Sequence, residues 1–141
     1  MGLKTRVGAA GILGLFVGLG LAEGQASEAV PLSPQAFRDY AEGHTLFFEN
    51  GGEAFGAETF LPGDRSVWRY EGGRCVAGTW RVRGAQICFL YSEGEDELCW
   101  RFLRLGERLV ARLLGNGPDA GFELEVTGRD RAPVLCPGPG V

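Results

Sequence analysis

Between residues 45 and 127 the chain repeats one pattern, in which a short run of alternating apolar and polar residues is followed by a turn signal. The turn signals are of the Asn-Gly-Gly, Pro-Gly-Asp and Gly-Gly kind, and turns at intervals of about 8–12 residues are typical of antiparallel strands. The runs that we expect to be strands cover residues 45–49, 55–61, 66–71, 75–83, 86–91, 98–105, 108–114 and 122–127. The pattern predicts a mainly β fold, a single antiparallel meander of about eight strands that forms a small barrel or a sandwich.

One short helix is expected before the strands, over residues 34–42. Ser33 is a favoured N-cap residue and Pro34 suits the first helical position. A helix of about two turns is not stable alone, so its apolar face is expected to pack on the sheet. Residues 27–32 are expected to form a short flexible lead. Residues 133–141, rich in Pro and Gly, are expected to form an irregular C-terminal tail.

The first 26 residues have the features of a secretory signal peptide. Lys4 and Arg6 precede an uncharged run over residues 7–22, and small residues suited to cleavage lie near its end. The run is shorter than the roughly 20 apolar residues of a spanning helix, so we expect cleavage and no stable membrane anchor. The mature protein is then expected in the periplasm or secreted, as a single β domain over residues 27–141.

Four cysteines lie in that domain: Cys75, Cys88, Cys99 and Cys136. An even count in an exported chain favours two disulfides, with three pairings open, over a zinc site, which needs closer pairs such as Cys-x-x-Cys. A hairpin centred near residues 93–94 would place Cys88 opposite Cys99 on the outer face of the sheet. We therefore predict Cys88–Cys99 and Cys75–Cys136, the second of which would hold the C-terminal tail to the body.

The alternation separates two faces of the predicted sheet. One face collects aromatic and aliphatic side chains, whereas the other carries Arg, acids and the cysteines, which is typical of a half-solvated antiparallel sheet. Candidate ligand-facing residues on the apolar face are Trp68, Tyr70, Trp80, Phe89, Trp100 and Phe102. In a closed barrel these side chains can line a cavity for a small apolar ligand, and in a sandwich or collapsed barrel they fill the core. The short domain and its aromatic content favour filling.

We expect no catalytic residues, no cofactor and no metal site. His44 is the only imidazole, and no serine has the pattern of an activated nucleophile, so a solvent-facing or capping role is favoured. The acids of loop 93–97 do not match the spacing of a calcium loop, which favours a solvated loop. Glu49 and Glu58 are the only acids flanked by aromatic runs, and no glycosidase pair is assigned to them.

The net charge of −4 argues against nucleic acid as a partner, because phosphate binding needs a basic surface. The expectation is an exported, non-enzymatic domain that binds a small apolar ligand or an envelope component. The alternative is a protein-binding inhibitor of a basic cell-wall enzyme, which the acidic loop 93–97 would contact.

Four elements of the chain carry a resemblance: Gly78-Thr79-Trp80, Ile87-Cys88-Phe89, Cys99-Trp100 and Cys136-Pro137. In these elements residues 33–137 resemble a group of small exported bacterial proteins of uncharacterised function, which have a short helix followed by a Gly-punctuated β meander. The resemblance implies an exported β domain and implies no activity.

Overall fold

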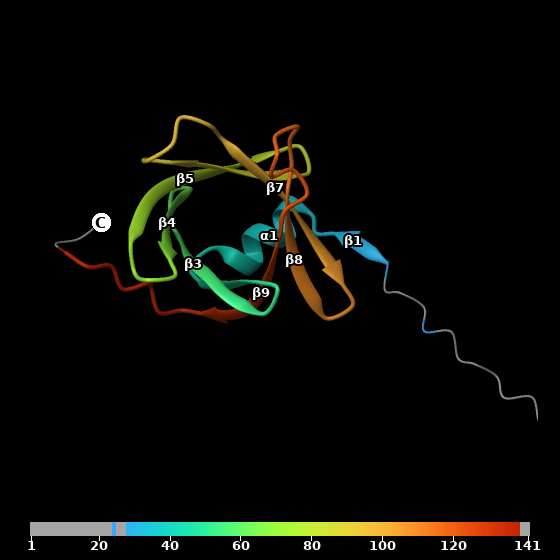
Figure 1. Ribbon diagram of the computed structural model, residues 1–141, viewed down its shortest axis with the longest axis horizontal. Coiled ribbons are helices and arrows are strands. Elements are labelled where there is room, and N and C mark those ends of the chain that lie inside the picture. Colours follow the sequence, from blue (N-terminus) through green and yellow to red (C-terminus); the bar gives the residue numbers. More distant parts are fainter. Residues whose placement is uncertain (1–23, 25–27, 139–141) are drawn as a thin grey trace, which may run out of the picture.

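The computed structural model describes Gly24 and residues 28–138 of the chain. It contains one helix and nine strands in this part (Figure 1). Their bounds are β1 (Ala29–Pro31), α1 (Pro34–Ala41), β2 (Thr45–Asn50), β3 (Glu53–Leu61), β4 (Arg65–Tyr70), β5 (Cys75–Arg83), β6 (Gln86–Tyr91), β7 (Leu98–Leu105), β8 (Arg108–Leu113) and β9 (Glu123–Asp130). The predicted mainly β, antiparallel fold is confirmed.

Strands β2 to β9 form a closed barrel of eight strands. Each pairs antiparallel with the next along the chain, and β9 returns to pair with β2, with Thr45 opposite Asp130. The closure decides between the two predicted architectures in favour of the barrel. It also explains why β9 is longer than the expected strand 122–127, because residues up to Asp130 find backbone partners on β2.

The segment expected to be a flexible lead instead contributes a ninth strand. Residues Ala29–Pro31 pair with β7, opposite Leu103–Leu105, beyond the short stretch in which β6 pairs with β7. The pattern of the lead is too short for a strand to be recognised from alternation. These residues form a strand because β6 pairs only with the first part of β7. The edge of Leu103–Leu105 on that side is therefore left free to hydrogen-bond with them.

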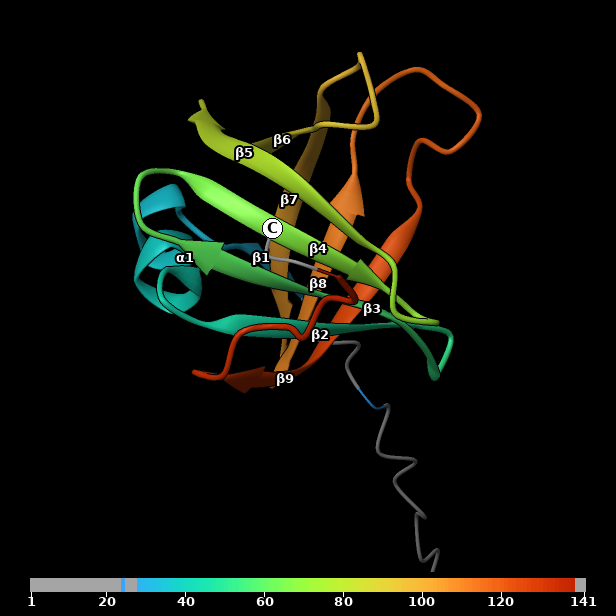
Figure 2. The same ribbon diagram turned by 90° about the vertical axis from the view of Figure 1, so that its left-hand side faces the viewer.

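The helix α1 begins as predicted and covers one end of the barrel. The Ser33 side chain accepts a hydrogen bond from the backbone N–H of Ala36 at 3.1 Å, and Pro34 opens the helix. Phe37 and Ala41 are fully buried. In Figure 2 the helix lies at the left-hand end of the barrel, where it closes the interior.

The apolar face of the predicted sheet is the inside of the barrel, as alternation indicated. Large side chains of this face with exposed fractions of 8% or less include Phe48, Phe60, Trp68, Trp80, Ile87, Phe89 and Phe102. These residues belong to one core cluster together with Phe37 of the helix.

Both disulfides have the predicted pairing. Cys88 lies directly opposite Cys99 on paired strands and is bonded to it, and Cys75 at the start of β5 is bonded to Cys136. The C-terminal segment that leads to Cys136 covers the outside of β2 and β3, where the Thr45 hydroxyl donates to the carbonyl of Ala132 at 2.7 Å. The tail therefore packs against the outside of the barrel, although residues 131 to 138 contain no strand.

The predicted signal peptide, residues 1–26, lies outside the described residues except for Gly24. Within the described part of the chain, none of the helical structure has the length and apolarity needed to cross a membrane.

Candidate functional site

The two ends of the barrel differ in how their interior is filled. At the end covered by α1, the Phe37 ring lies 5.6 Å from Phe60, 5.8 Å from Trp80 and 4.2 Å from Phe102, measured between ring centroids. These rings pack against one another beneath the helix, where Trp80 is only 2% exposed. Aromatic side chains thus fill the closed end as a protein core does.

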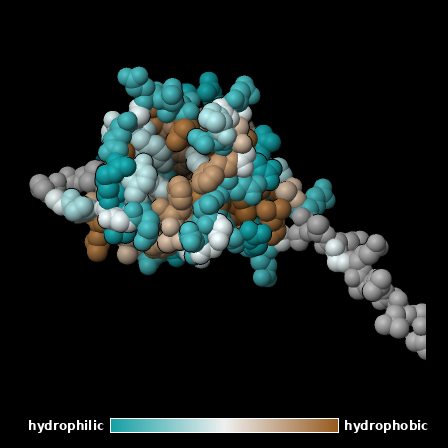
Figure 3. All heavy atoms as spheres, in the orientation of Figure 1, coloured by the Kyte–Doolittle hydropathy of each residue, from teal (hydrophilic) through white to brown (hydrophobic). Residues whose placement is uncertain are grey.

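Towards the other end the interior is hollow. A cavity of about 410 Å³ opens between the strands there, and Figure 3 shows a hollow bordered by hydrophobic residues on the face viewed in Figure 1. Most of its lining is apolar, and nine of the lining residues are aromatic. The lining comprises Phe48, Phe55, Glu58, Trp68, Tyr70, Phe89, Tyr91, Leu98, Trp100, Phe102, Ala111, Leu113, Asp119, Phe122 and Leu124.

All but one of the candidate ligand-facing residues contribute to this cavity. Its walls include Trp68, Tyr70, Phe89, Trp100 and Phe102. Trp80 does not line it, because this side chain packs beneath α1 at the closed end. The inward aromatic residues therefore divide between two roles that the sequence analysis treated as alternatives, since some fill the core and others border a hollow.

A bulge in β3 adds an aromatic side chain to the mouth of the cavity. The register between β2 and β3 shifts after Phe48, so that Glu49 lies opposite Ala54 and Phe55 has no partner on β2. The Phe55 ring lies 6.0 Å from Trp68 and 5.6 Å from Phe122. Strict alternation would place Phe55 on the outer face, and the bulge turns it to the rim instead.

Gly56, next to this bulge, gives Trp68 the space that it occupies. A Cβ at Gly56 would overlap the Trp68 ring and would lie 2.7 Å from the backbone oxygen of Arg69. The missing side chain therefore allows the indole of Trp68 to lie close to the backbone of β3, where it forms part of the cavity wall.

One carboxyl group lies inside the barrel, on Glu58 in β3. Its side chain is 3% exposed, and the Tyr91 hydroxyl on β6 donates to both of its carboxylate oxygens, at 2.9 and 3.0 Å. Ser66 on β4 also lies close to the carboxyl group, but its hydroxyl makes no hydrogen bond of good geometry within the described structure. Tyr91 is therefore the group that orients Glu58.

Burial alters the ionisation of this pair. It raises the pKa of Glu58 to about 7, against the opposing effect of the hydrogen-bonded Tyr91 hydroxyl and of the nearby polar Ser66 side chain. Burial, reinforced by the negative charge on Glu58, raises the pKa of Tyr91 well above its ordinary value, so Tyr91 remains a hydrogen-bond donor. The cavity thus contains a carboxyl group that changes charge near neutral pH.

The sequence analysis noted Glu58 but assigned it no role. A signal for its position was present, since Glu58 is separated by one residue from the inward-facing Phe60, whereas Thr59 between them has the opposite orientation. Glu49, the other acid flanked by aromatic runs, is not among the residues that line the cavity.

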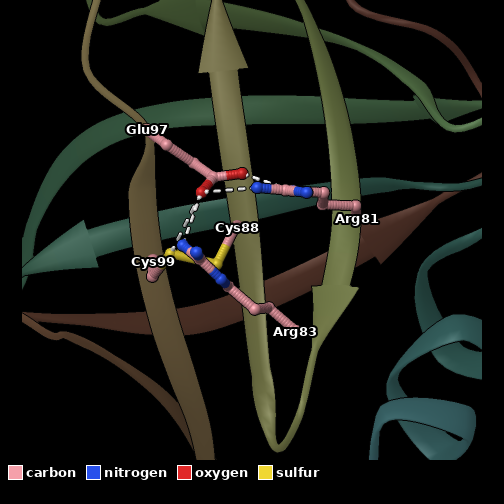
Figure 4. Close-up of polar contacts among 5 residues, drawn as sticks. All are labelled: Arg81, Arg83, Cys88, Glu97 and Cys99. Atoms are coloured by element: carbon pink, nitrogen blue, oxygen red, sulfur yellow. Dashed lines mark hydrogen bonds and ion pairs between the residues drawn. A yellow bond between two sulfur atoms is a disulfide. The ribbon is translucent and has the colours of Figure 1, made fainter.

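The predicted disulfide Cys88–Cys99 lies on the outside of the barrel beneath a cluster of charged groups. Figure 4 shows Glu97 between two arginines, with Arg81 donating to it at 2.6 Å and Arg83 at 3.1 Å. Glu97 and the two sulfur atoms lie within 4.8 Å of one another. The sulfurs are consumed by the disulfide and the carboxylate is engaged by arginine, so this group does not offer a set of free metal ligands.

The same ion pairs alter the character of loop 93–97. Glu93 forms an ion pair with Arg74, and Glu97 pairs with Arg81 and Arg83. Neighbouring arginines therefore offset part of the acidic charge that motivated the inhibitor alternative. No observation of the structure favours that alternative over the cavity.

His44 lies away from the cavity, after the end of α1. Its Nδ1 is 3.0 Å from the carbonyl of Glu42, and its Nε2 is 2.9 Å from the Arg129 guanidinium, which requires that nitrogen to accept. The His44 side chain links the end of α1 to β9. Its partners in these hydrogen bonds are a backbone carbonyl and a guanidinium, and neither is a serine, a cysteine or a carboxylate side chain.

Comparison of the chain with protein-family models, with curated proteins and with solved structures yields no match.

Proposed function

We propose that the protein is an exported, non-enzymatic domain that holds a small, largely apolar molecule in the open half of its barrel. The observation that carries the proposal is the cavity of about 410 Å³. This volume falls within the range of about 300–1,000 Å³ that is common for small-molecule sites. Apolar walls with a few converging polar groups are also typical of such sites.

The arrangement of the walls supports a binding role. The rings of Phe55 and Trp100 both lie against Phe122, at 5.6 and 6.4 Å, so side chains from three separate segments form a continuous aromatic border. The Tyr91 and Phe89 rings are stacked 6.0 Å apart on one strand. Aromatic side chains held by such mutual contacts keep their positions when the space between them is filled, which limits the entropic cost of binding.

The two disulfides support the exported location. Disulfides form and persist mainly in oxidising compartments, and both pairs of cysteines in the described chain are bonded. A small domain that is stabilised covalently and encloses an apolar cavity suits the capture or carriage of a poorly soluble molecule outside the cytoplasm.

The proposal is tested with N-phenyl-1-naphthylamine, a neutral apolar probe whose fluorescence increases when it leaves water. The purified protein without its first 26 residues is expected to bind the probe saturably. Leu113→Trp, which adds a bulky ring to the cavity lining, is expected to weaken binding at least about tenfold because the probe and the new side chain compete for one space.

The matched control is Leu90→Trp, the same substitution at an exposed position on β6 that does not line the cavity. It is expected to bind the probe as the wild type does. Equal weakening by both variants, or wild-type binding by a folded Leu113→Trp variant, would contradict the proposed site. The proposal also requires that the bound molecule is recovered chemically unchanged after incubation, which mass spectrometry checks.

A further inference from the structure

The ionisable groups that line the cavity all have the same sign. Besides its tyrosines, the lining contains two carboxyl groups, Glu58 in the interior and Asp119 at the mouth, and no Arg, Lys or His among the described residues that form it. Elsewhere on the barrel, acids are commonly paired with arginine, as Glu125 is with Arg108 at 2.7 Å. Glu58 has no ion pair with any described residue, so its negative charge is uncompensated.

The groups around Glu58 suit a cation. Trp68 lies directly opposite Glu58 on the neighbouring strand, and the Phe48 ring lies 5.5 Å from Trp68. Aromatic faces attract positive charge, more strongly when both partners are removed from water. An ammonium group beside Glu58 would meet a carboxylate and aromatic rings within one small space.

Other head groups satisfy fewer of these features. A carboxylate ligand would place a second negative charge beside Glu58, which is unfavourable in a site of low dielectric constant. An alcohol would supply one hydrogen bond and leave the charge on Glu58 uncompensated. Above the pKa of Glu58, a cationic head group both neutralises the buried carboxylate and interacts favourably with the surrounding rings.

From this arrangement, and resting on the proposed function, we infer that the ligand is an apolar amine whose ammonium group pairs with Glu58 while its apolar body lies among the aromatic side chains of the cavity. Tyr91 holds the carboxylate in place through its two short hydrogen bonds. The raised pKa of Glu58, about 7, makes the carboxylate form accessible at neutral and alkaline pH.

The test compares three probes that share one body: 4-phenylbutylamine, 4-phenylbutan-1-ol and 4-phenylbutyrate. Their affinities are measured by calorimetry at about pH 8.5, above the pKa of Glu58 of about 7. The amine is expected to bind at least about tenfold more tightly than the alcohol, since one charge-assisted contact contributes that much. The carboxylate is expected to bind most weakly.

Glu58→Gln is expected to remove the preference of the amine over the alcohol, because the amide keeps the shape and lacks the charge. Glu125→Gln makes the same change on the outer surface and is expected to retain the preference. At about pH 5, where Glu58 is protonated, the preference is expected to shrink in the wild type. The other ionisable side chains facing this space are Tyr70, Asp119 at the mouth, and Tyr91, whose pKa is raised well above its ordinary value by burial and by Glu58.

The outcomes separate the two proposals. Equal binding of the amine and the alcohol by the wild type, or an unchanged preference in Glu58→Gln, overturns the inferred amine while leaving an apolar binding site. Failure of all three probes, together with failure of the neutral naphthylamine probe, overturns the binding function and the inferred amine with it.

Discussion

At the scale of single residues, Glu58 is a buried acid in an environment that its chemistry does not favour. An acid in an apolar interior loses hydration, and here the hydroxyl of Tyr91 replaces only part of it. Such a residue reduces stability when it is charged. Its presence among aromatic rings is compatible with the proposed role in binding, because perturbed ionisable groups are common in binding sites.

This environment predicts how stability depends on pH. The pKa of Glu58 is about 7 in the folded state against 4.5 for an ordinary Glu, so the folded state holds the proton more tightly. The contribution of Glu58 to stability is therefore fully present below pH 4.5, declines as the pH rises and is lost above about 7. The decline is roughly 3 kcal/mol, at about 1.4 kcal/mol for each pH unit between the two values.

Urea unfolding of the wild type and of Glu58→Gln between about pH 4.5 and 8.5 measures this contribution. The difference in unfolding free energy between the two proteins should change with pH in the stated direction. Glu97 and Glu125, whose pKa values are lowered by Arg81 and Arg108, act at lower pH and are common to both proteins. Parallel pH profiles would mean that Glu58 titrates normally.

At the scale of elements, the two disulfides stabilise different parts of the barrel. Cys88–Cys99 joins adjacent strands that are already paired, with a sequence separation of 11. Cys75–Cys136 has a separation of 61 and fixes a segment without strand pairing of its own. The hydrogen bond from the backbone N–H of Val134 to the Thr59 hydroxyl, at 2.9 Å, depends on that segment staying in place.

Replacement of each pair by alanine is expected to reduce stability to different extents. On a chain-entropy basis, opening the longer loop costs about 4 kcal/mol and opening the shorter one about 3 kcal/mol. The double variant Cys75→Ala/Cys136→Ala should lose more, because it also uncovers the buried Thr45 and Thr59. Urea unfolding midpoints provide the comparison, and a larger loss in Cys88→Ala/Cys99→Ala would contradict this order.

At the scale of the whole molecule, the barrel has one closed end and one open end. The helix α1 and the residues beneath it fill the closed end, where Trp80 is 2% exposed. Trp100 borders the cavity at the other end and is partly exposed. The tryptophans therefore report on the two ends separately.

Variants with one tryptophan test this polarity. Trp68→Phe/Trp80→Phe keeps Trp100, and Trp68→Phe/Trp100→Phe keeps Trp80. Acrylamide should quench the fluorescence of Trp100 several times more efficiently than that of Trp80, because only Trp100 borders the opening. The naphthylamine probe should reduce the quenching of Trp100 by acrylamide and leave the quenching of Trp80 unchanged. Equal quenching of both tryptophans would contradict the assignment of one open and one closed end.

Much of this architecture could be predicted from the sequence because it depends on local patterns. Alternation and turn residues identify the eight barrel strands and their inward faces, and counting from the 93–94 hairpin pairs Cys88 with Cys99. The strand Ala29–Pro31 was not predicted. It exists because β7 has a free edge, which is a property of the assembled sheet.

The cavity was less predictable for a related reason. Whether inward aromatic side chains fill a barrel or border a hollow depends on where each lies along the barrel axis, and the alternation that assigns faces carries no such information. Trp80 and Trp100 have the same inward pattern and lie at opposite ends. The bulge at Phe55 adds a further departure, since one unpaired residue reverses the orientation expected from alternation.

The closed end has a kinetic consequence. Because Phe37 and its neighbours obstruct the end beneath α1, a molecule in the cavity enters and leaves by the same route, past Phe55, Tyr70 and Leu98 at the mouth. By microscopic reversibility, a change that narrows this route without altering the bound contacts slows association and dissociation by the same factor. The rim would then determine how long a molecule resides in the barrel, and the interior would determine how tightly it is held.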